Sequence, residues 1–114
     1  GDFQVGNIFS GLSKGPKTVV VKDASNCEFS QNVAITSGIS FSTTISPIIQ
    51  SSCATPGCHN GSRSPNLTSF SNIKSNAGRI KIRTSNRSMP QGSSLSQTQI
   101  DAIGCWVDDG APNN

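Results

Sequence analysis

The feature that most constrains this chain is the segment 53–59, which reads Cys-Ala-Thr-Pro-Gly-Cys-His and places a histidine directly after the second of two cysteines. His59 is the only histidine of the 114 residues, and the chain also contains a single methionine, Met89. Thiols and an imidazole are the side chains that hold haem or zinc in proteins, and two nearby thiols can also form a disulfide. Any fold for this chain therefore has to present the two thiols and the imidazole together on one short loop.

Two cysteines followed by a histidine are typical of covalent haem attachment, and the usual form of that motif is Cys-x-x-Cys-His. Here the gap between the cysteines is four residues, so the additional residues have to bulge outward. Pro56 and Gly57 suit such a bulge, because proline fixes φ and glycine tolerates a positive φ. With no second histidine available, Met89 is the best candidate for the other axial ligand, with Lys81 or water as alternatives.

Two other interpretations of the motif stay open. Cys53 and Cys58 could close a small disulfide loop that leaves His59 exposed. The same three residues could instead bind zinc with a further cysteine, since three cysteines and a histidine form a structural zinc set. A zinc site would leave the pair Met89-Pro90 without an explanation.

The composition favours a small exported protein whose core is completed by something other than side chains. Hydrophobic residues make up 32% of the chain and charged residues 13%, and a domain of this size is marginal when its core is poor. If Cys53 and Cys58 hold haem, Cys27 and Cys105 are left to form a disulfide. Disulfides persist in oxidising compartments, so we expect a periplasmic, extracellular or cell-surface location. We also expect a mature or excised fragment, because no signal peptide is visible at its start.

The pattern of residues predicts an N-terminal arm followed by a helical region. In residues 1–40, two short β-branched runs at 18–21 and 32–36 predict weak strands and at most one β-hairpin in an extended arm. Further along, isoleucines recur on one helical face and predict a helix from Thr43 or Thr44 to Cys53.

Three later segments complete the prediction. A second helix is expected over Ser69–Ser75. Residues 79–83 alternate charged and apolar side chains, which allows either a strand or a short helix. The last helix has the clearest signals, since Ser96 and Gln99 form a capping box and Gly110 suits its end.

Over residues 41–114, roughly two-thirds of the chain, the sequence resembles a class I, mitochondrial-type monohaem cytochrome c domain of the kind found in bacterial exported and cell-surface proteins. The resemblance is carried by these segments in this order: Phe41-Ser42-Thr43-Thr44-Ile45-Ser46-Pro47-Ile48-Ile49, Cys53, Cys58, His59, Pro65-Asn66-Leu67, Arg79-Ile80, Ser88-Met89-Pro90, Leu95-Ser96, Ile103, Trp106-Val107 and Gly110-Ala111-Pro112. The four-residue gap departs from the family pattern. The resemblance implies a mainly α fold, a small cytochrome c domain of about three to four helices around one haem, preceded by the irregular or β-hairpin arm 1–40.

The resemblance also implies a site. One haem c would be attached through Cys53 and Cys58, with His59 and Met89 as the axial ligands of its iron.

Four further residues are expected beside that haem. Pro65 and Leu67 would pack on the histidine side, with the Pro65 carbonyl orienting a ring nitrogen. Arg79 or Trp106 would touch a propionate.

These expectations describe an electron carrier and not an enzyme, because a His/Met-ligated iron has no open coordination position. We expect transient redox protein partners and no membrane span. Nucleic acid is not expected, since the basic residues are not interleaved with aromatic ones. A haem peroxidase or gas sensor is an alternative if Met89 is labile. Another is an electron-relay or structural subunit of a larger extracellular assembly or dehydrogenase, and the arm 1–40 suggests such self-assembly or fusion.

Overall fold

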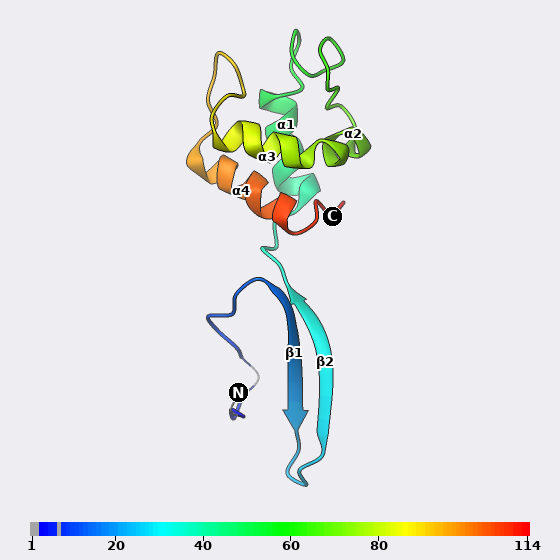
Figure 1. Cartoon of the computed structure of the whole chain (residues 1–114), viewed down its shortest axis with the longest axis vertical. Coiled ribbons are helices and arrows are strands. Elements are labelled where there is room, and N and C mark those ends of the chain that lie inside the picture. Colours follow the sequence, from blue (N-terminus) through cyan, green and yellow to red (C-terminus); the bar gives the residue numbers. More distant parts are fainter. Residues whose placement is uncertain (1–2, 7) are drawn as a thin grey trace. The chain divides into compact units, whose positions relative to one another are not determined.

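The computed structural model describes residues 3–6 and 8–114, and it divides into two compact units, residues 1–37 and residues 38–114. The first unit contains the strands β1 and β2, and the second contains a π-helical turn, η1, and the helices α1 to α4 (Figure 1). The sequence placed the boundary between residues 40 and 41, and the structure places it between residues 37 and 38.

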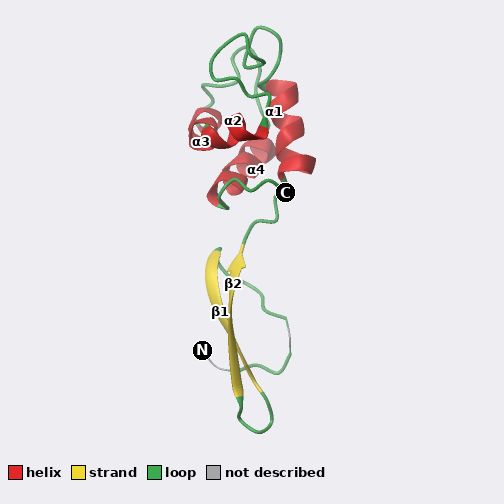
Figure 2. Ribbon diagram, turned by 90° about the vertical axis from the view of Figure 1, so that its right-hand side faces the viewer, coloured by secondary structure: helices red, strands yellow, loops and turns green. Residues whose placement is uncertain are grey.

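The first unit is built on a β-hairpin, in which β1 (Gly15–Lys22) pairs antiparallel with β2 (Glu28–Ile35) (Figure 2). The connecting turn is held by Asp23, whose side-chain oxygen Oδ1 accepts hydrogen bonds from the backbone N–H groups of Ser25 at 2.8 Å and Cys27 at 3.0 Å. An aspartate that binds the backbone two residues ahead is a common turn former. The expected hairpin is thus confirmed, and its strands are longer than the runs that predicted them.

The mainly α fold expected from the sequence is wrong. Helices account for 35% of the structure, and the two-stranded sheet accounts for another 14%, so the chain has a mixed fold. The reason is that polar residues of β2, which carry little strand signal alone, pair along the full length of the valine-rich β1. The architecture does not show a cytochrome c fold.

The helical region begins with η1 (Phe41–Ile45) and continues directly into α1 (Ser46–Ser52). The Ser40 hydroxyl caps this start by accepting a hydrogen bond from the Thr43 backbone N–H at 3.3 Å. Pro47 lies in the first turn of α1, the part of a helix where proline is tolerated best. The expected helix before Cys53 is therefore present and starts earlier than predicted.

Two short helices follow, α2 (Phe70–Ser75) and α3 (Ala77–Ser85), with Asn76 between them. Residues 79–83 are helical, so the strand alternative does not hold. The helix separates the two isoleucines that alternation would place on one face: Ile80 is buried, whereas Ile82 is 62% exposed.

The last helix, α4 (Gln97–Asp108), has the predicted capping box. The Ser96 hydroxyl accepts from the Gln99 N–H at 3.2 Å, and the Gln99 side-chain oxygen accepts from the Ser96 N–H at 2.9 Å. Gly110 follows the helix with a φ of 96°, a conformation that glycine adopts without strain. At 12 residues α4 is the longest helix, and no helix in the described part of the chain is long and apolar enough to cross a membrane.

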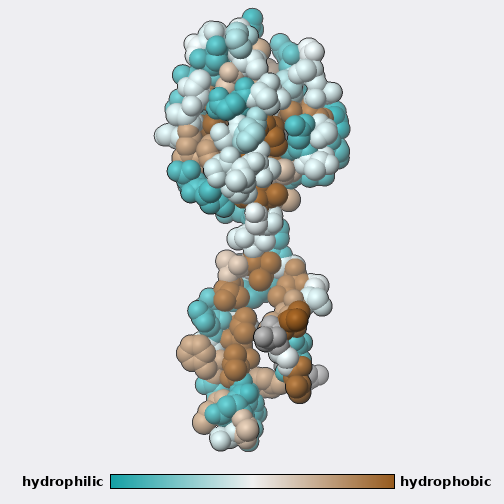
Figure 3. All heavy atoms as spheres, turned by 180° about the vertical axis from the view of Figure 1, so that it is seen from behind, coloured by the Kyte–Doolittle hydropathy of each residue, from teal (hydrophilic) through white to brown (hydrophobic). Residues whose placement is uncertain are grey.

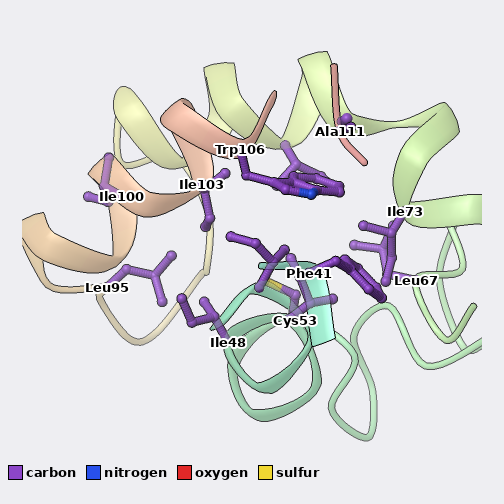
Figure 4. Packing of buried hydrophobic residues seen from close by; sticks show 14 residues of the cluster. Phe41, Ile48, Cys53, Leu67, Ile73, Leu95, Ile100, Ile103, Trp106 and Ala111 are labelled. Atoms are coloured by element: carbon purple, nitrogen blue, oxygen red, sulfur yellow. The ribbon is translucent and has the colours of Figure 1, made fainter. Parts of the chain in front are cut away.

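The hydrophobic core lies entirely within the second unit, and η1 and the helices α1, α2, α3 and α4 all contribute to it (Figure 4). Trp106 is completely buried and lies 5.6 Å from Phe41 between ring centroids. Phe70 also packs edge-on against Phe41, with 4.8 Å between the ring centroids. The core members are Phe41, Ile45, Ile48, Ile49, Cys53, Leu67, Ile73, Ala77, Ile80, Leu95, Ile100, Ile103, Trp106 and Ala111.

Candidate functional site

A cavity of about 290 Å³ lies in the second unit, beside the Cys53–His59 segment. Its walls come from the end of α1, the loop 59–67, the helix α3 and the loop after α3. The lining residues are Cys53, His59, Ser64, Pro65, Leu67, Asn76, Arg79, Ile80, Arg83, Thr84 and Met89. Six of the eight residues that the sequence singled out therefore meet around one space: Cys53, His59, Met89, Pro65, Leu67 and Arg79.

The four residues between the cysteines form a closed turn. The Cys58 N–H donates to the Thr55 carbonyl oxygen at 3.0 Å, and Gly57 has a φ of 78°. Proline at the second and glycine at the third position of such a turn are the signature of type II. The His59 N–H then donates to the Cys53 carbonyl oxygen at 3.0 Å. The longer gap is thus absorbed by an outward turn, and the two ends of the motif still meet.

The His59 ring is held by the loop that follows it. Its Nδ1 lies 2.9 Å from the Pro65 carbonyl oxygen, and since a carbonyl can only accept, Nδ1 carries the proton. The Leu67 N–H donates to the His59 carbonyl oxygen at 2.7 Å. In the neutral ring this leaves Nε2 unprotonated, with its lone pair available to a metal. The hydrogen bond expected from Pro65 is present, and its role beside a cofactor stays a prediction.

Cys53 and Cys58 have different surroundings. Cys53 is buried in the hydrophobic core and also lines the cavity, whereas Cys58 is half-buried and is not among the lining residues. Burial raises the pKa of the Cys53 thiol to about 11, and the charge of Cys58 adds to the effect. Cys53 is therefore a neutral thiol at physiological pH.

Met89 reaches the cavity from a loop that is tied back to the end of α3. Its N–H donates to the Arg83 carbonyl oxygen at 3.1 Å. Arg87, which has a φ of 59°, holds the far side of the loop through the Leu95 carbonyl oxygen at 3.3 Å and the Gln97 side-chain oxygen at 3.0 Å. The position of Met89 is thus set by its backbone hydrogen bond to Arg83 and by the hydrogen bonds of the charged Arg87 side chain.

One face of α3 lines the cavity, and most of that face was missed from the sequence. Asn76, Ile80, Arg83 and Thr84 recur at helical spacing and join the expected Arg79. They could have been found if residues 79–83 had been interpreted as a helix, since positions three and four apart share a face. Ser64, the other missed residue, carries no such signal.

The lining divides into an apolar and a cationic part. Leu67, Ile80 and Cys53 are buried, whereas Arg79 and Arg83 are exposed. None of the described residues that line the cavity has an acidic side chain. The cavity therefore suits a molecule with a large apolar body and negatively charged groups at its edge.

Trp106 does not lie at this cavity, although it was expected beside a propionate. It is buried against Phe41, and its indole Nε1–H donates to the Pro112 carbonyl oxygen at 2.9 Å. With its only donor used in this way, Trp106 is a core residue of α4.

The described residues include all four cysteines, and no disulfide joins any of them. The expected Cys27–Cys105 bond is therefore absent from the structure: Cys27 lies in the hairpin turn of the first unit and Cys105 in α4 of the second. The alternative loop closed by a Cys53–Cys58 disulfide is absent as well. Within the same described residues no three side chains of histidine, cysteine, aspartate or glutamate converge on a point, which leaves the zinc alternative without a ligand set.

Comparison with known proteins gives no assignment. No protein-family model, no curated protein and no solved structure matches this chain.

Proposed function

We propose that this chain carries one covalently attached haem c and acts as a one-electron carrier. The observation that carries the proposal is the meeting of His59 and Met89 with Cys53 around one cavity. These are the chain's only imidazole and its only thioether side chain, and they come from loops 30 residues apart in the sequence. The family resemblance of residues 41–114 belongs to this proposal.

The lining of the cavity supports a haem in preference to a small metal ion. Its buried residues offer an apolar surface for a macrocycle, and Arg79 and Arg83 offer two exposed guanidinium groups for the two propionates. Arginine is well suited to bind carboxylates, because its planar fork donates two parallel hydrogen bonds. A zinc ion would use neither feature.

The two axial ligands would be held in place in different ways. The Pro65 carbonyl fixes the tautomer of His59 and orients its ring, as second-layer partners of metal-binding histidines commonly do. Among the described residues none forms a hydrogen bond with the Met89 sulfur, whose position therefore depends on that of its loop. When bound, the haem supplies the one-electron couple of its iron, and a methionine ligand raises the reduction potential relative to a second histidine.

The cysteines would act as the covalent attachment points. Each thiol would add its sulfur and its proton across one vinyl group, so that a carbon–sulfur bond forms and no oxidant is consumed. The high pKa of Cys53 keeps that proton on the sulfur. Cys58 is half-buried and does not line the cavity, so its side chain would have to turn toward the cavity to reach the other vinyl group.

An exported protein with transient redox partners follows from this function. Such encounters use small interfaces, and c-type haem attachment takes place outside the cytoplasm.

A redox titration of the purified exported protein, followed by visible absorption, tests the proposal. We expect a single one-electron wave and, in the oxidised form, the weak long-wavelength band of a methionine–iron bond. A high-spin spectrum without that band, together with rapid turnover of peroxide, would instead identify an enzyme with an open iron site.

A further inference from the structure

The β-hairpin of the first unit is amphipathic. Directly opposite residues of an antiparallel pair point to the same face, so the register assigns each side chain to one of two faces. One face carries Lys17, Val19, Val21, Phe29, Gln31, Val33 and Ile35, and the other carries Pro16, Thr18, Val20, Lys22, Glu28, Ser30, Asn32 and Ala34. The first face is mainly apolar and the second mainly polar.

Within the described residues the apolar face is only partly covered: Lys17, Val19, Val33 and Ile35 are half-buried, whereas the part next to the hairpin turn is exposed. Val21 is 59% exposed and Phe29 66% exposed, and every buried hydrophobic residue in the described part of the chain belongs to residues 41–111. In Figure 3 brown spheres, which mark hydrophobic residues, are spread over the surface of the first unit, in the lower part of the view. A two-stranded hairpin is marginal in water, and three or more strands with a hydrophobic face are needed for independent stability.

The two edges of this sheet are protected to different degrees. Proteins discourage pairing at an exposed edge with proline and with charged residues, lysine above all. Strand β1 carries Pro16, Lys17 and Lys22, whereas β2 has no proline and one charge, Glu28, at its first residue. No third strand pairs with either edge within the described residues. The open edge is therefore β2.

We propose that β2 pairs antiparallel with β2 of a second copy of this chain, about a two-fold axis at Gln31, to form a four-stranded sheet. Because side chains alternate between faces, only registers that oppose residues of the same parity keep all apolar side chains on one face. Centring on Gln31 satisfies this condition. It also opposes Phe29 to Val33 of the second copy, an aromatic–β-branched pair of the kind that stabilises sheets.

Charge supports a second copy as the occupant of this edge. In the proposed register Glu28 faces Ala34 of the other chain, so no like charges are opposed. Residues 1–37 contain three lysines and three acidic residues, whereas the six other basic and three other acidic side chains all lie in residues 38–114, so the net charge of +3 belongs to the second unit. The arm is thus neutral and does not repel its own copy. This inference does not depend on the haem.

Sedimentation velocity of the full chain over a range of concentrations tests the proposal. We expect a concentration-dependent dimer. Gln31→Lys and Gln31→Glu each place two like charges opposite one another at the two-fold axis, and each should raise the dimer dissociation constant on the order of fivefold or more. Mixing the two variants opposes a lysine to a glutamate and should restore the dimer as a heterodimer.

Val20→Lys is the matched control, because it adds the same charge to β1, away from the proposed interface. It should dimerise as the unmodified chain does. A monomer at every concentration would overturn the proposal. So would a dimer that Gln31→Lys leaves intact, or one that Val20→Lys weakens equally, since neither result is compatible with pairing at Gln31.

Discussion

The His59 Nδ1–H donates a hydrogen bond of 2.9 Å to the Pro65 carbonyl oxygen. A second bond, from the Leu67 N–H to the His59 carbonyl oxygen at 2.7 Å, fixes the backbone of the same residue. The ring and the main chain of the only histidine are therefore both held before any ligand binds. Met89, on the other part of the cavity wall, is held only through its loop, so its position is the easier one to disturb.

Replacing Met89 by alanine should remove one iron ligand and leave the haem attached, because the thioethers and His59 do not depend on it. The long-wavelength absorption band should disappear, and added imidazole should bind on the order of tenfold more tightly or better. Optical titration measures both effects. Ile82→Ala, on the exposed side of α3, is the control, and an unchanged spectrum in Met89→Ala would show that another group binds the iron.

Arg87 should govern how firmly Met89 is held. Arg87→Gly suits the φ of 59° and removes both side-chain hydrogen bonds. It therefore tests these two hydrogen bonds without adding backbone strain. Each bond contributes about 0.5–1.5 kcal/mol, and imidazole affinity should rise about threefold to tenfold, less than in Met89→Ala. Arg87→Lys keeps the positive charge and loses the two guanidinium hydrogen bonds. If it binds imidazole as the unmodified protein does, the charge, and not these hydrogen bonds, holds the Met89 loop.

The local elements that could be predicted are those that a few neighbouring side chains determine. The capping box of Ser96 and Gln99 and the outward turn at Pro56-Gly57 depend on the side chains of a few neighbouring residues, and both are present. The convergence of His59 and Met89 was expected from the family resemblance. It depends on long-range packing that no local pattern encodes.

The failures have physical causes as well. Residues 79–83 alternate charged and apolar side chains, as a strand does. They form a helix in which Ile80 is buried and Ile82 is exposed, and the alternation alone does not encode this difference. Trp106 was expected at the cofactor, and the Pro112 carbonyl takes its donor instead. The fold class was wrong because polar β2 residues become a strand only through their pairing with β1.

In the chain without attached haem, Cys53 should be the slowest thiol to alkylate at neutral pH, because its pKa is raised to about 11. Mass spectrometry of iodoacetamide-treated protein should find Cys27, which is exposed, modified first. A Cys53 that reacts as fast as Cys27 at pH 7 in folded protein would contradict the burial of this thiol.

In the chain without attached haem, the same raised pKa makes the free energy of unfolding depend on pH. Folding favours the protonated thiol, so the contribution is fully present below the unfolded-state pKa near 9 and is lost as pH rises through about 11. The loss should amount to roughly 2 to 3 kcal/mol. Urea unfolding at several pH values measures it, and Cys53→Ala should lack this part of the decline.

Leu67 should matter for stability more than its size suggests. It is 3% exposed, packs in the core and lines the cavity, so Leu67→Ala should lower the free energy of unfolding by about 2–5 kcal/mol. Ile82→Ala removes similar bulk from a side chain that is 62% exposed and should cost well under half as much. Equal losses of unfolding free energy in the two variants would show that the core does not include Leu67 at the cavity.

The central claim is tested most directly by the intact mass of the exported protein, measured together with its pyridine haemochrome spectrum. The account predicts the mass of the chain plus one haem that resists acid extraction, and the spectrum of a haem with two saturated thioether links. Cys53→Ser and Cys58→Ser should each retain a haem through one remaining bond and shift the spectrum toward that of a single link. A mass equal to the chain alone, with no haem absorption after expression alongside a working attachment system, would contradict the account.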